Sequence, residues 1–214
     1  MKLYVYDHCP FCVKARAIFG LKETSVELVI LLNDDEATPN RMIGRKMAPI
    51  LEHEGRYIPE SMDILAYVDG LREPQLMGEA CNPRVSAWIE AVGEVVYRLA
   101  IPRWASSDFA EFATPEARAY FTRNKEAMIG PFADRMDESA GLVTVLNRHL
   151  QELSDLIATP EAVNGVLSAD DVHLFAILRS ISIVRGVVYP AKVEAYRARM
   201  AERTGIDLHD AIAR

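Results

Sequence analysis

Two cysteines near the start of the chain form the residue pattern with the clearest chemistry: Cys9 and Cys12, in the stretch CPFC. Cysteines at this spacing can supply half of a metal site, form a structural disulfide, or act as a redox pair. A zinc site needs about four ligands, but Cys81 is the one further cysteine and the five histidines are scattered. A disulfide across so short a loop would constrain the unfolded chain little. We therefore expect no metal and favour the redox pair.

The position of CPFC indicates what each thiol would do. A strand-like LYVY precedes it, and Pro10 is suited to the first position of a helix. Cys9 would then be the N-cap, where free backbone amides and the positive end of the helix dipole stabilise a thiolate. We expect Cys9 to attack and Cys12, one turn in and more enclosed, to resolve. Lys14 and Arg16 are nearby cations that could assist, although solvated positions on the helix surface explain them equally well.

The elements that must position these thiols alternate between strand and helix. Residues that favour strands predict strands at 3–6, 26–32, 49–51 and 56–58, the last two joined by a tight turn. Helices are predicted at 10–20 and 61–71, the second with Ser61 as its N-cap, and a short helix or irregular turn at 38–44. The order βαβαββα describes an α/β domain at residues 1–72.

An irregular segment and a helical region follow this domain. Residues 73–84 hold two prolines and a glycine without periodicity, which predicts a linker that includes Cys81, a thiol to which we assign no role. Helical spacing then predicts helices at 84–99, 115–137, 141–157, 169–186 and 190–204. Ser168 and Asp171 have the spacing of a capping box at the start of the fourth. Residues 85–214 should form an all-α domain, so that the fold class is α/β plus all-α.

The composition excludes several classes of function. The net charge is −7 and no run of lysine or arginine occurs, so we expect no nucleic-acid partner. No stretch approaches the roughly 18 apolar residues of a membrane helix, and Lys2 is followed by strand-like residues rather than a signal peptide. Three cysteines do not make a disulfide framework. We expect a cytoplasmic protein with no membrane partner.

The motif and its context resemble a known family. A strand, Cys-Pro-aromatic-Cys, and a proline opening the third strand resemble the thioredoxin fold and the glutaredoxins, whose CPYC has tyrosine where this chain has Phe11. The stretches YDHCPFC, LLNDD, APILE and RYIPESMDI, with the helical remainder, are similar to the glutaredoxin 2 family, the large glutaredoxins built like a glutathione transferase. The resemblance covers essentially the whole chain. It implies a thioredoxin-like domain, a transferase-type helical domain and glutathione as the reducing cosubstrate.

The resemblance also implies residues that bind glutathione beside the thiols. Pro10 and Phe11 belong to this set through the motif. Pro49 aligns with a cis-proline that faces the cysteines, and cis peptides are essentially confined to X-Pro bonds. Ala48 before it would pair its backbone with that of the glutathione cysteine. Relatives often have valine or threonine at this position, and alanine removes side-chain packing there.

Both charged ends of glutathione need partners as well. Glu60-Ser61 matches the acidic-Ser pair that holds the γ-glutamyl end in transferase-like proteins. A helix N-terminus at Ser61 can bind a carboxylate, and Glu60 can pair with an ammonium. The glycine carboxylate needs a cation, for which Lys22, Arg45 and Lys46 are candidates among which the local sequence does not choose.

Three functions follow from these observations. The leading one is a glutathione-dependent disulfide oxidoreductase that reduces protein disulfides and glutathione mixed disulfides through Cys9 and Cys12, as a monomer in electron transport. A glutathione transferase or dehydroascorbate reductase is an alternative, because a fold does not fix a function. A third is a module in which Cys9 and glutathione hold an iron–sulfur cluster between two chains. The proline of the motif and the bulky second domain argue against the third.

Overall fold

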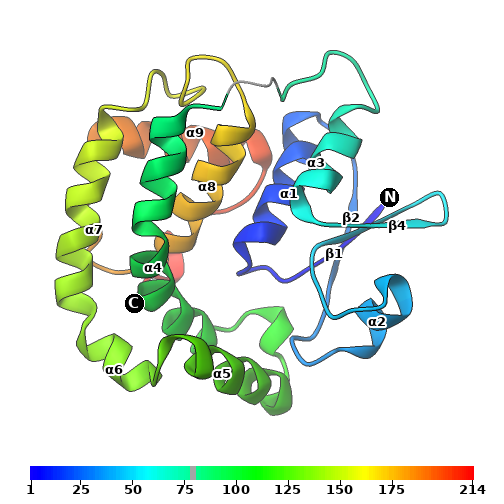
Figure 1. Cartoon of the computed structure of the whole chain (residues 1–214), viewed down its shortest axis with the longest axis horizontal. Coiled ribbons are helices and arrows are strands. Elements are labelled where there is room, and N and C mark those ends of the chain that lie inside the picture. The colour runs from blue at the N-terminus through cyan, green and yellow to red at the C-terminus, as the bar shows by residue number, and fades with distance from the viewer. Residues whose placement is uncertain (78–80) are drawn as a thin grey trace.

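A four-stranded sheet forms the N-terminal part of the chain (Figure 1). The computed structural model describes residues 1–77 and 81–214, with strands β1 (Lys2–Val5), β2 (Glu27–Ile30), β3 (Ile50–His53) and β4 (Arg56–Pro59). They lie in the order β2-β1-β3-β4, with β2 parallel to β1 and the other neighbours antiparallel. Because β3 runs opposite to β1, the segment after β1 and the segment before β3 meet at one edge of the sheet.

Three helices complete this part of the chain: α1 (Pro10–Leu21), α2 (Ala37–Ile43) and α3 (Ser61–Asp69). Helices α1 and α3 pack against each other beside the sheet, and α2 lies near β4 (Figure 1). Helix α1 buries Cys12, Ala15 and Ile18 completely, and Cys9 is its N-cap residue, as predicted. The order of elements is the predicted βαβαββα. The CPFC stretch therefore stands at the edge of the sheet where β1 and β3 meet.

The rest of the chain is helical. Its helices are α4 (Pro83–Ala105), α5 (Pro115–Ile129), α6 (Phe132–Asp137), α7 (Ser139–Ser154), α8 (Ala169–Ile181) and α9 (Ala191–Thr204), with 3₁₀ helices η1 (Ala110–Phe112) and η2 (Asp210–Ile212). Helix α1 contacts α8 and α9, and one cluster of buried apolar side chains runs through both parts of the chain. Helix α1, which begins within the redox motif, thus lies between the sheet and the helical part of the chain (Figure 1).

Three predicted helices have wrong boundaries. The helix predicted at 169–186 ends at Ile181, because residues 182–186 form turns. The predicted helix at 115–137 is two helices, because Gly130 has a φ of +85° and Pro131 follows it, so that the chain turns between α5 and α6. Helix α4 continues past residue 99 through Pro102, because the side chains of its last turn are buried and the Arg103 guanidinium donates to the Leu99 carbonyl at 2.7 Å. Tertiary packing overrides the helix-breaking tendency of Pro102.

The cap prediction for Ser61 also needs correction. Glu60, with a φ of +68°, is the N-cap of α3, and Ser61 is the first helical residue. The predicted capping box of α8 is confirmed, since the backbone N–H of Ser168 donates to the Asp171 carboxylate at 2.9 Å. Of the predicted linker at 73–84, residues 78–80 lie outside the described residues.

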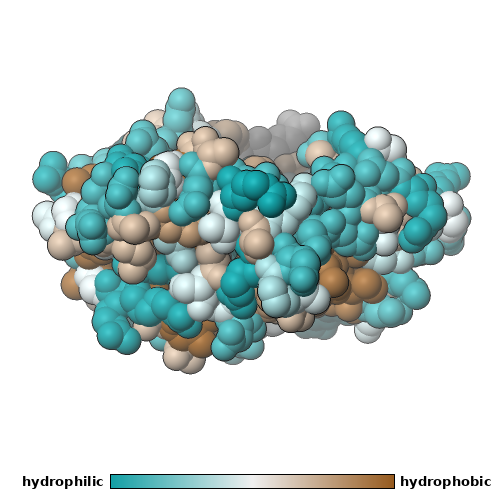
Figure 2. Space-filling model, turned by 90° about the horizontal axis from the view of Figure 1, so that it is seen from below, coloured by the Kyte–Doolittle hydropathy of each residue, from teal (hydrophilic) through white to brown (hydrophobic). Residues whose placement is uncertain are grey.

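The surface is rich in polar side chains, as expected for a chain in which 26% of the residues are charged. The face seen in Figure 2 is mostly hydrophilic, and its hydrophobic residues lie in separate small patches. No helix within residues 1–77 and 81–214 has the length and apolar character needed to cross a membrane.

Candidate active site

The two thiols differ in how far solvent can reach them. Cys9 follows the turn after β1 and is half-buried, whereas Cys12, in the first turn of α1, is completely buried. Both are free thiols, and the backbone N–H of Tyr6 donates to the Cys12 sulfur at 3.4 Å. Cys9 is therefore the thiol that an external disulfide can approach, and Cys12 stands behind it.

The surroundings of the two thiols separate their acidities. A hydrogen bond from the Cys12 thiol lowers the pKa of Cys9 to about 6 against the opposing effect of burial, with help from the His8 charge and the backbone N–H groups of Phe11 and Cys12. Burial raises the pKa of Cys12, and its hydrogen bond to Cys9 raises it further. At neutral pH, Cys9 is a thiolate and Cys12 is a thiol. This is the acidity expected of an attacking cysteine at a helix N-terminus.

A cavity of about 290 Å³ opens beside Cys9 and is lined from both parts of the chain. The N-terminal part contributes Tyr6, His8, Cys9, Asn33, Lys46, Met47 and Ala48, and α5 contributes Tyr120, Phe121, Asn124 and Lys125. The cavity is a cleft between the end of the sheet and the helical part, which is a usual location for a small-molecule site.

The predicted glutathione-binding residues do not all face this cavity. Ala48 lines it and is joined to buried Pro49 by a cis peptide bond, as the resemblance predicts. Pro49, Glu60 and Ser61 do not line it, but β3 and β4 pair at Ile50 and Pro59, which places Glu60-Ser61 at the same end of the hairpin.

The other two residues of the motif, Pro10 and Phe11, also lie outside the cavity lining. Pro10 is buried, whereas Phe11 is 49% exposed with the Lys14 ammonium 4.9 Å from its ring centroid. The structure therefore brings Cys9 and Ala48 together directly and leaves Phe11 on the surface beside them.

The three candidate cations occupy different places. Lys22 lies at the opposite end of α1, where its ammonium donates to the Asp69 and Pro74 carbonyls at 3.0 and 2.8 Å and lies 3.3 Å from the Asp69 carboxylate. Arg45 is exposed and pairs with Glu60 at 3.0 Å. Lys46 lines the cavity beside Cys9, and its ammonium lies 3.5 Å from the centroid of the Tyr120 ring.

Sequence reasoning missed two residues that contact the turn carrying Cys9. His8 and Glu111 form a buried pair, in which the imidazole Nδ1 lies 2.7 Å from the Glu111 carboxylate. The position of His8 next to Cys9 was a signal that could have drawn attention to it. Glu111 lies 103 positions away, on η1, and no local pattern marks it.

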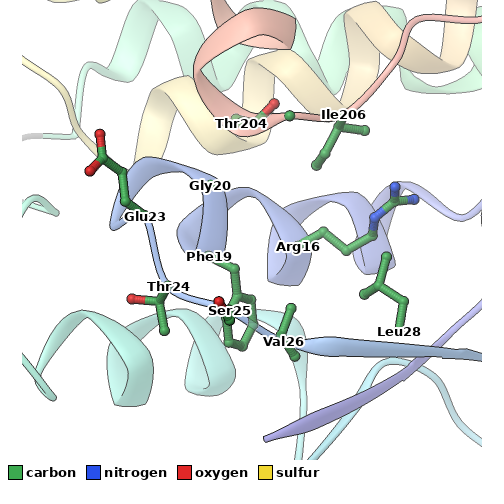
Figure 3. Close-up of a pocket in the computed structure, with 11 residues that line it drawn as sticks. Arg16, Phe19, Gly20, Glu23, Thr24, Ser25, Val26, Leu28, Thr204 and Ile206 are labelled. Atoms are coloured by element: carbon green, nitrogen blue, oxygen red, sulfur yellow. The ribbon is translucent and has the colours of Figure 1, made fainter.

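A second cavity lies at the far end of α1 (Figure 3). It has a volume of about 340 Å³ and is lined by residues of α1, β2 and the end of α9, including Arg16, Leu28 and Ile206. Gly20 of α1 approaches Thr204 closely there, so that a Cβ at Gly20 would lie 2.1 Å from the Thr204 carbonyl oxygen. Neither thiol lines this cavity, and it is separate from the candidate active site.

Comparison with known proteins assigns both parts of the chain. Residues 84–213 match the family described as Glutaredoxin 2, C terminal domain, and residues 3–75 match Glutathione S-transferase, N-terminal domain. Glutaredoxin 2 of Escherichia coli (strain K12) is 49% identical over 214 residues, covering the full length of both chains.

Solved structures agree with this assignment. Glutaredoxin 2 of Salmonella typhimurium, solved in complex with glutathione, is 52% identical with a TM-score of 0.98, covering 100% of this chain and 98% of that one. A glutathione S-transferase of Ceriporiopsis subvermispora shares the fold at 14% identity and a TM-score of 0.67, over 99% of this chain and 96% of that one. With thiols, cleft and helical part arranged as described, this chain belongs to the glutaredoxin 2 family.

Proposed function

We propose that Cys9 and Cys12 are the redox pair of this glutathione-dependent thiol-disulfide oxidoreductase. The observation that carries the proposal is the half-buried Cys9 thiol at the N-terminus of α1, open to a cavity, with the buried Cys12 thiol behind it. The lowered pKa of Cys9 supplies a thiolate at neutral pH. The raised pKa of Cys12 keeps it a thiol until Cys9 has reacted.

For a glutathione mixed disulfide, one cysteine suffices. The Cys9 thiolate attacks the glutathione sulfur, a Cys9–glutathione disulfide forms, and the substrate leaves as its thiolate, which takes up a proton from water. A second glutathione, as thiolate, attacks the glutathione sulfur of that disulfide. Cys9 leaves as a thiolate and oxidised glutathione is released.

For a protein disulfide, both cysteines take part. Cys9 attacks one sulfur of the substrate, and the other sulfur leaves as a thiolate. Cys12 then loses its proton and attacks Cys9, which releases the reduced substrate and leaves a Cys9–Cys12 disulfide. Two molecules of glutathione reduce this disulfide and become one molecule of oxidised glutathione. The 3.4 Å hydrogen bond from the Tyr6 N–H to the Cys12 sulfur can stabilise Cys12 as it ionises.

Glutathione fits the cleft with its sulfur toward Cys9. In this arrangement the Ala48 backbone pairs with the backbone of the glutathione cysteine. Ala48 is in reach of glutathione because it lines the cavity. Lys46 is the cation that we assign to the glycine carboxylate, since Lys22 is held at the far end of α1 and Arg45 is paired with Glu60. Glu60 and Ser61, at the N-terminus of α3, receive the γ-glutamyl end.

The same proposal covers the setting of the reaction. The chain acts as a monomer, as expected of the large glutaredoxins that it resembles. It transfers electrons from glutathione to disulfide-containing or glutathionylated proteins in the cytoplasm, a compartment that keeps free thiols such as Cys9, Cys12 and Cys81 reduced.

Single-cysteine kinetics test this proposal. Reduction of a small glutathione mixed disulfide is measured with the wild type, Cys9→Ser and Cys12→Ser. We expect Cys9→Ser to lose activity to the uncatalysed level and Cys12→Ser to retain it, while reduction of a protein disulfide requires both cysteines. An active Cys9→Ser protein, or one that gains conjugating activity toward an electrophile, would contradict the assignment and favour a transferase.

A further inference from the structure

Glu111 makes two hydrogen bonds to the residue that precedes the proposed nucleophile. Its Oε1 accepts from the backbone N–H of His8 at 3.0 Å and from the His8 imidazole Nδ1 at 2.7 Å. Burial alone would raise the pKa of the Glu111 carboxyl, but the hydrogen bonds and charge of His8 outweigh it and lower the pKa. The carboxylate is therefore ionised, and Nδ1 carries the proton between the two groups.

The pair is enclosed by aromatic rings. Glu111 is completely buried and His8 is 6% exposed. The centroids of the Trp104, Phe112 and Phe121 rings lie 5.1, 5.2 and 5.0 Å from that of His8. The second carboxylate oxygen of Glu111 is buried and has no hydrogen-bond partner among the residues that the structure describes. A buried carboxylate in such surroundings needs hydrogen-bond donors beside it, and the backbone N–H and imidazole of His8 are the donors in contact with it.

We propose that Glu111 is a positioning residue of the redox site. It holds the His8 imidazole in one orientation beside Cys9, so that the helical part of the chain sets the surroundings of the thiol. This inference rests on the proposed role of Cys9. Glu111 is not among the residues that line the cavity, and it acts through His8, which is.

The other titratable groups near the pair are these. The Asp7 carboxylate lies 2.5 Å from Arg16 of α1 and 3.0 Å from Arg179 of α8. Lys14 of α1, Tyr6 after β1 and Tyr97 of α4 interact with Cys9. His209, before η2, interacts with His8 and does not line the cavity. Burial lowers the pKa of His209 to about 3, so it is neutral and adds no charge there. Within the described residues, Glu111 is the carboxylate bonded to His8.

The consequence for Cys9 has a definite sign. The His8 charge is one of the causes that lower the Cys9 pKa. Removal of the Glu111 carboxylate takes away the group that holds the imidazole in place, and removal of the imidazole takes away the group that acts on Cys9. Both changes should leave Cys9 with a higher pKa and less thiolate at a given pH.

The test measures the pH dependence of Cys9 alkylation by iodoacetamide, followed by mass spectrometry of the peptide that contains Cys9, because Cys81 is also exposed. The variants are Glu111→Gln, His8→Gln and the double variant. Glu116→Gln is the matched control, an exposed carboxylate in the first turn of α5. We expect both single variants to raise the midpoint by about one pH unit, which is about a threefold slower reaction at pH 6.5. The control should match the wild type.

The double variant distinguishes positioning from a general structural effect. If Glu111 acts through His8, the double variant has the same midpoint as His8→Gln, because the two changes remove one interaction. An unchanged or lower midpoint for Glu111→Gln overturns the proposal, as do shifts that add in the double variant. Alkylation needs only the Cys9 thiol, so this failure is distinct from a failure of the proposed enzymatic roles, which the turnover of Cys9→Ser reports.

A measurement on the wild-type chain tests the proposal even if the variants do not fold. Isotope-edited NMR of the imidazole nitrogens shows which nitrogen of His8 carries a proton at each pH. We expect Nδ1 to be protonated throughout the pH range in which Cys9 titrates. Loss of the Nδ1 proton within that range would overturn the proposal.

Discussion

The Lys46 side chain connects two parts of the molecule at the rim of the active-site cavity. Its ammonium donates to the Asn33 carbonyl and lies over the Tyr120 ring, and burial lowers its pKa although nearby acidic residues oppose this effect. A cation held in this way has few hydration waters left to lose when a carboxylate arrives. That arrangement suits a binding site for the glycine end of glutathione.

Replacement of this cation should weaken glutathione binding more than catalysis. We expect Lys46→Gln to raise KM for glutathione about tenfold with a smaller change in kcat, the effect of losing one hydrogen bond between charged groups. Steady-state kinetics at varied glutathione concentration check this. Arg41→Gln, which removes an exposed cation of α2, is the matched control and should leave KM unchanged. Equal KM values for Lys46→Gln and the wild type would exclude Lys46 from the site.

At the scale of elements, the contact between α1 and α9 depends on one glycine. Gly20 lies in the last turn of α1 and has no room for a side chain against the Thr204 carbonyl (Figure 3). A backbone atom cannot move aside as a flexible side chain can. The distance between the two helices is therefore set by the absence of a Cβ at this position.

A methyl group at Gly20 should separate these helices. We expect Gly20→Ala to lower the free energy of unfolding by about 3 kcal/mol, at the upper end of the range for overpacking. In Gly93→Ala, a helical glycine of α4 with nothing near its Cβ, stability should rise by up to about 1 kcal/mol because alanine favours the helix. Urea unfolding of both variants measures the two effects. A stability loss in both, or in neither, would show that the close contact does not decide the outcome.

Most elements could be predicted from the sequence because their signals are local. The strand and helix order around CPFC, the N-cap position of Cys9 and the capping box of α8 each depend on residues within a few positions of one another. The boundary errors have a different cause. Pro102 inside α4 is tolerated because distant side chains bury the last turn, and the short 3₁₀ helix that carries Glu111 has no periodic pattern.

At the scale of the whole molecule, hydrogen bonds from two places in the helical part hold the turn before Cys9. Glu111 contacts His8, and Arg179 of α8 donates to the Asp7 carbonyl at 2.6 Å and to its carboxylate at 3.0 Å. The Arg179 side chain is 3% exposed. These contacts join residues 103 and 172 positions apart, which explains why a single sequence could not reveal them.

The Asp7–Arg179 pair should make stability depend on pH in acid. Burial alone would raise the Asp7 pKa, but Arg179 and Arg16 outweigh it and lower the pKa below its ordinary value of 3.8. A lowered pKa contributes stability that is present above about pH 4 and is lost as the pH falls through the folded-state value. Asp7→Asn should therefore cost about 2 kcal/mol at pH 7, less than a fully buried pair because the carboxylate is partly exposed.

Chemical denaturation at several pH values checks this dependence. The difference in unfolding free energy between the wild type and Asp7→Asn should shrink as the pH falls below about 4. Glu27→Gln is the control, because its exposed carboxylate lies 3.7 Å from Lys2 and should contribute little. A difference that stays constant on acidification would show that the charge of Asp7 is not the source of the stability.

The large sequence separation between the contacting residues also has a consequence for folding during biosynthesis. Cys9 leaves the ribosome near the start of synthesis, whereas Glu111 and Arg179 follow long after it. The N-terminal part of a chain generally begins to fold first. Here, however, the turn that carries Cys9 cannot form both sets of hydrogen bonds, to Glu111 and to Arg179, until α8 has been synthesised. A nascent chain therefore carries its reactive cysteine before the groups that surround it in the finished protein are present. The surroundings of the attacking thiol are therefore completed late in synthesis, by residues from the middle and the C-terminal part of the chain.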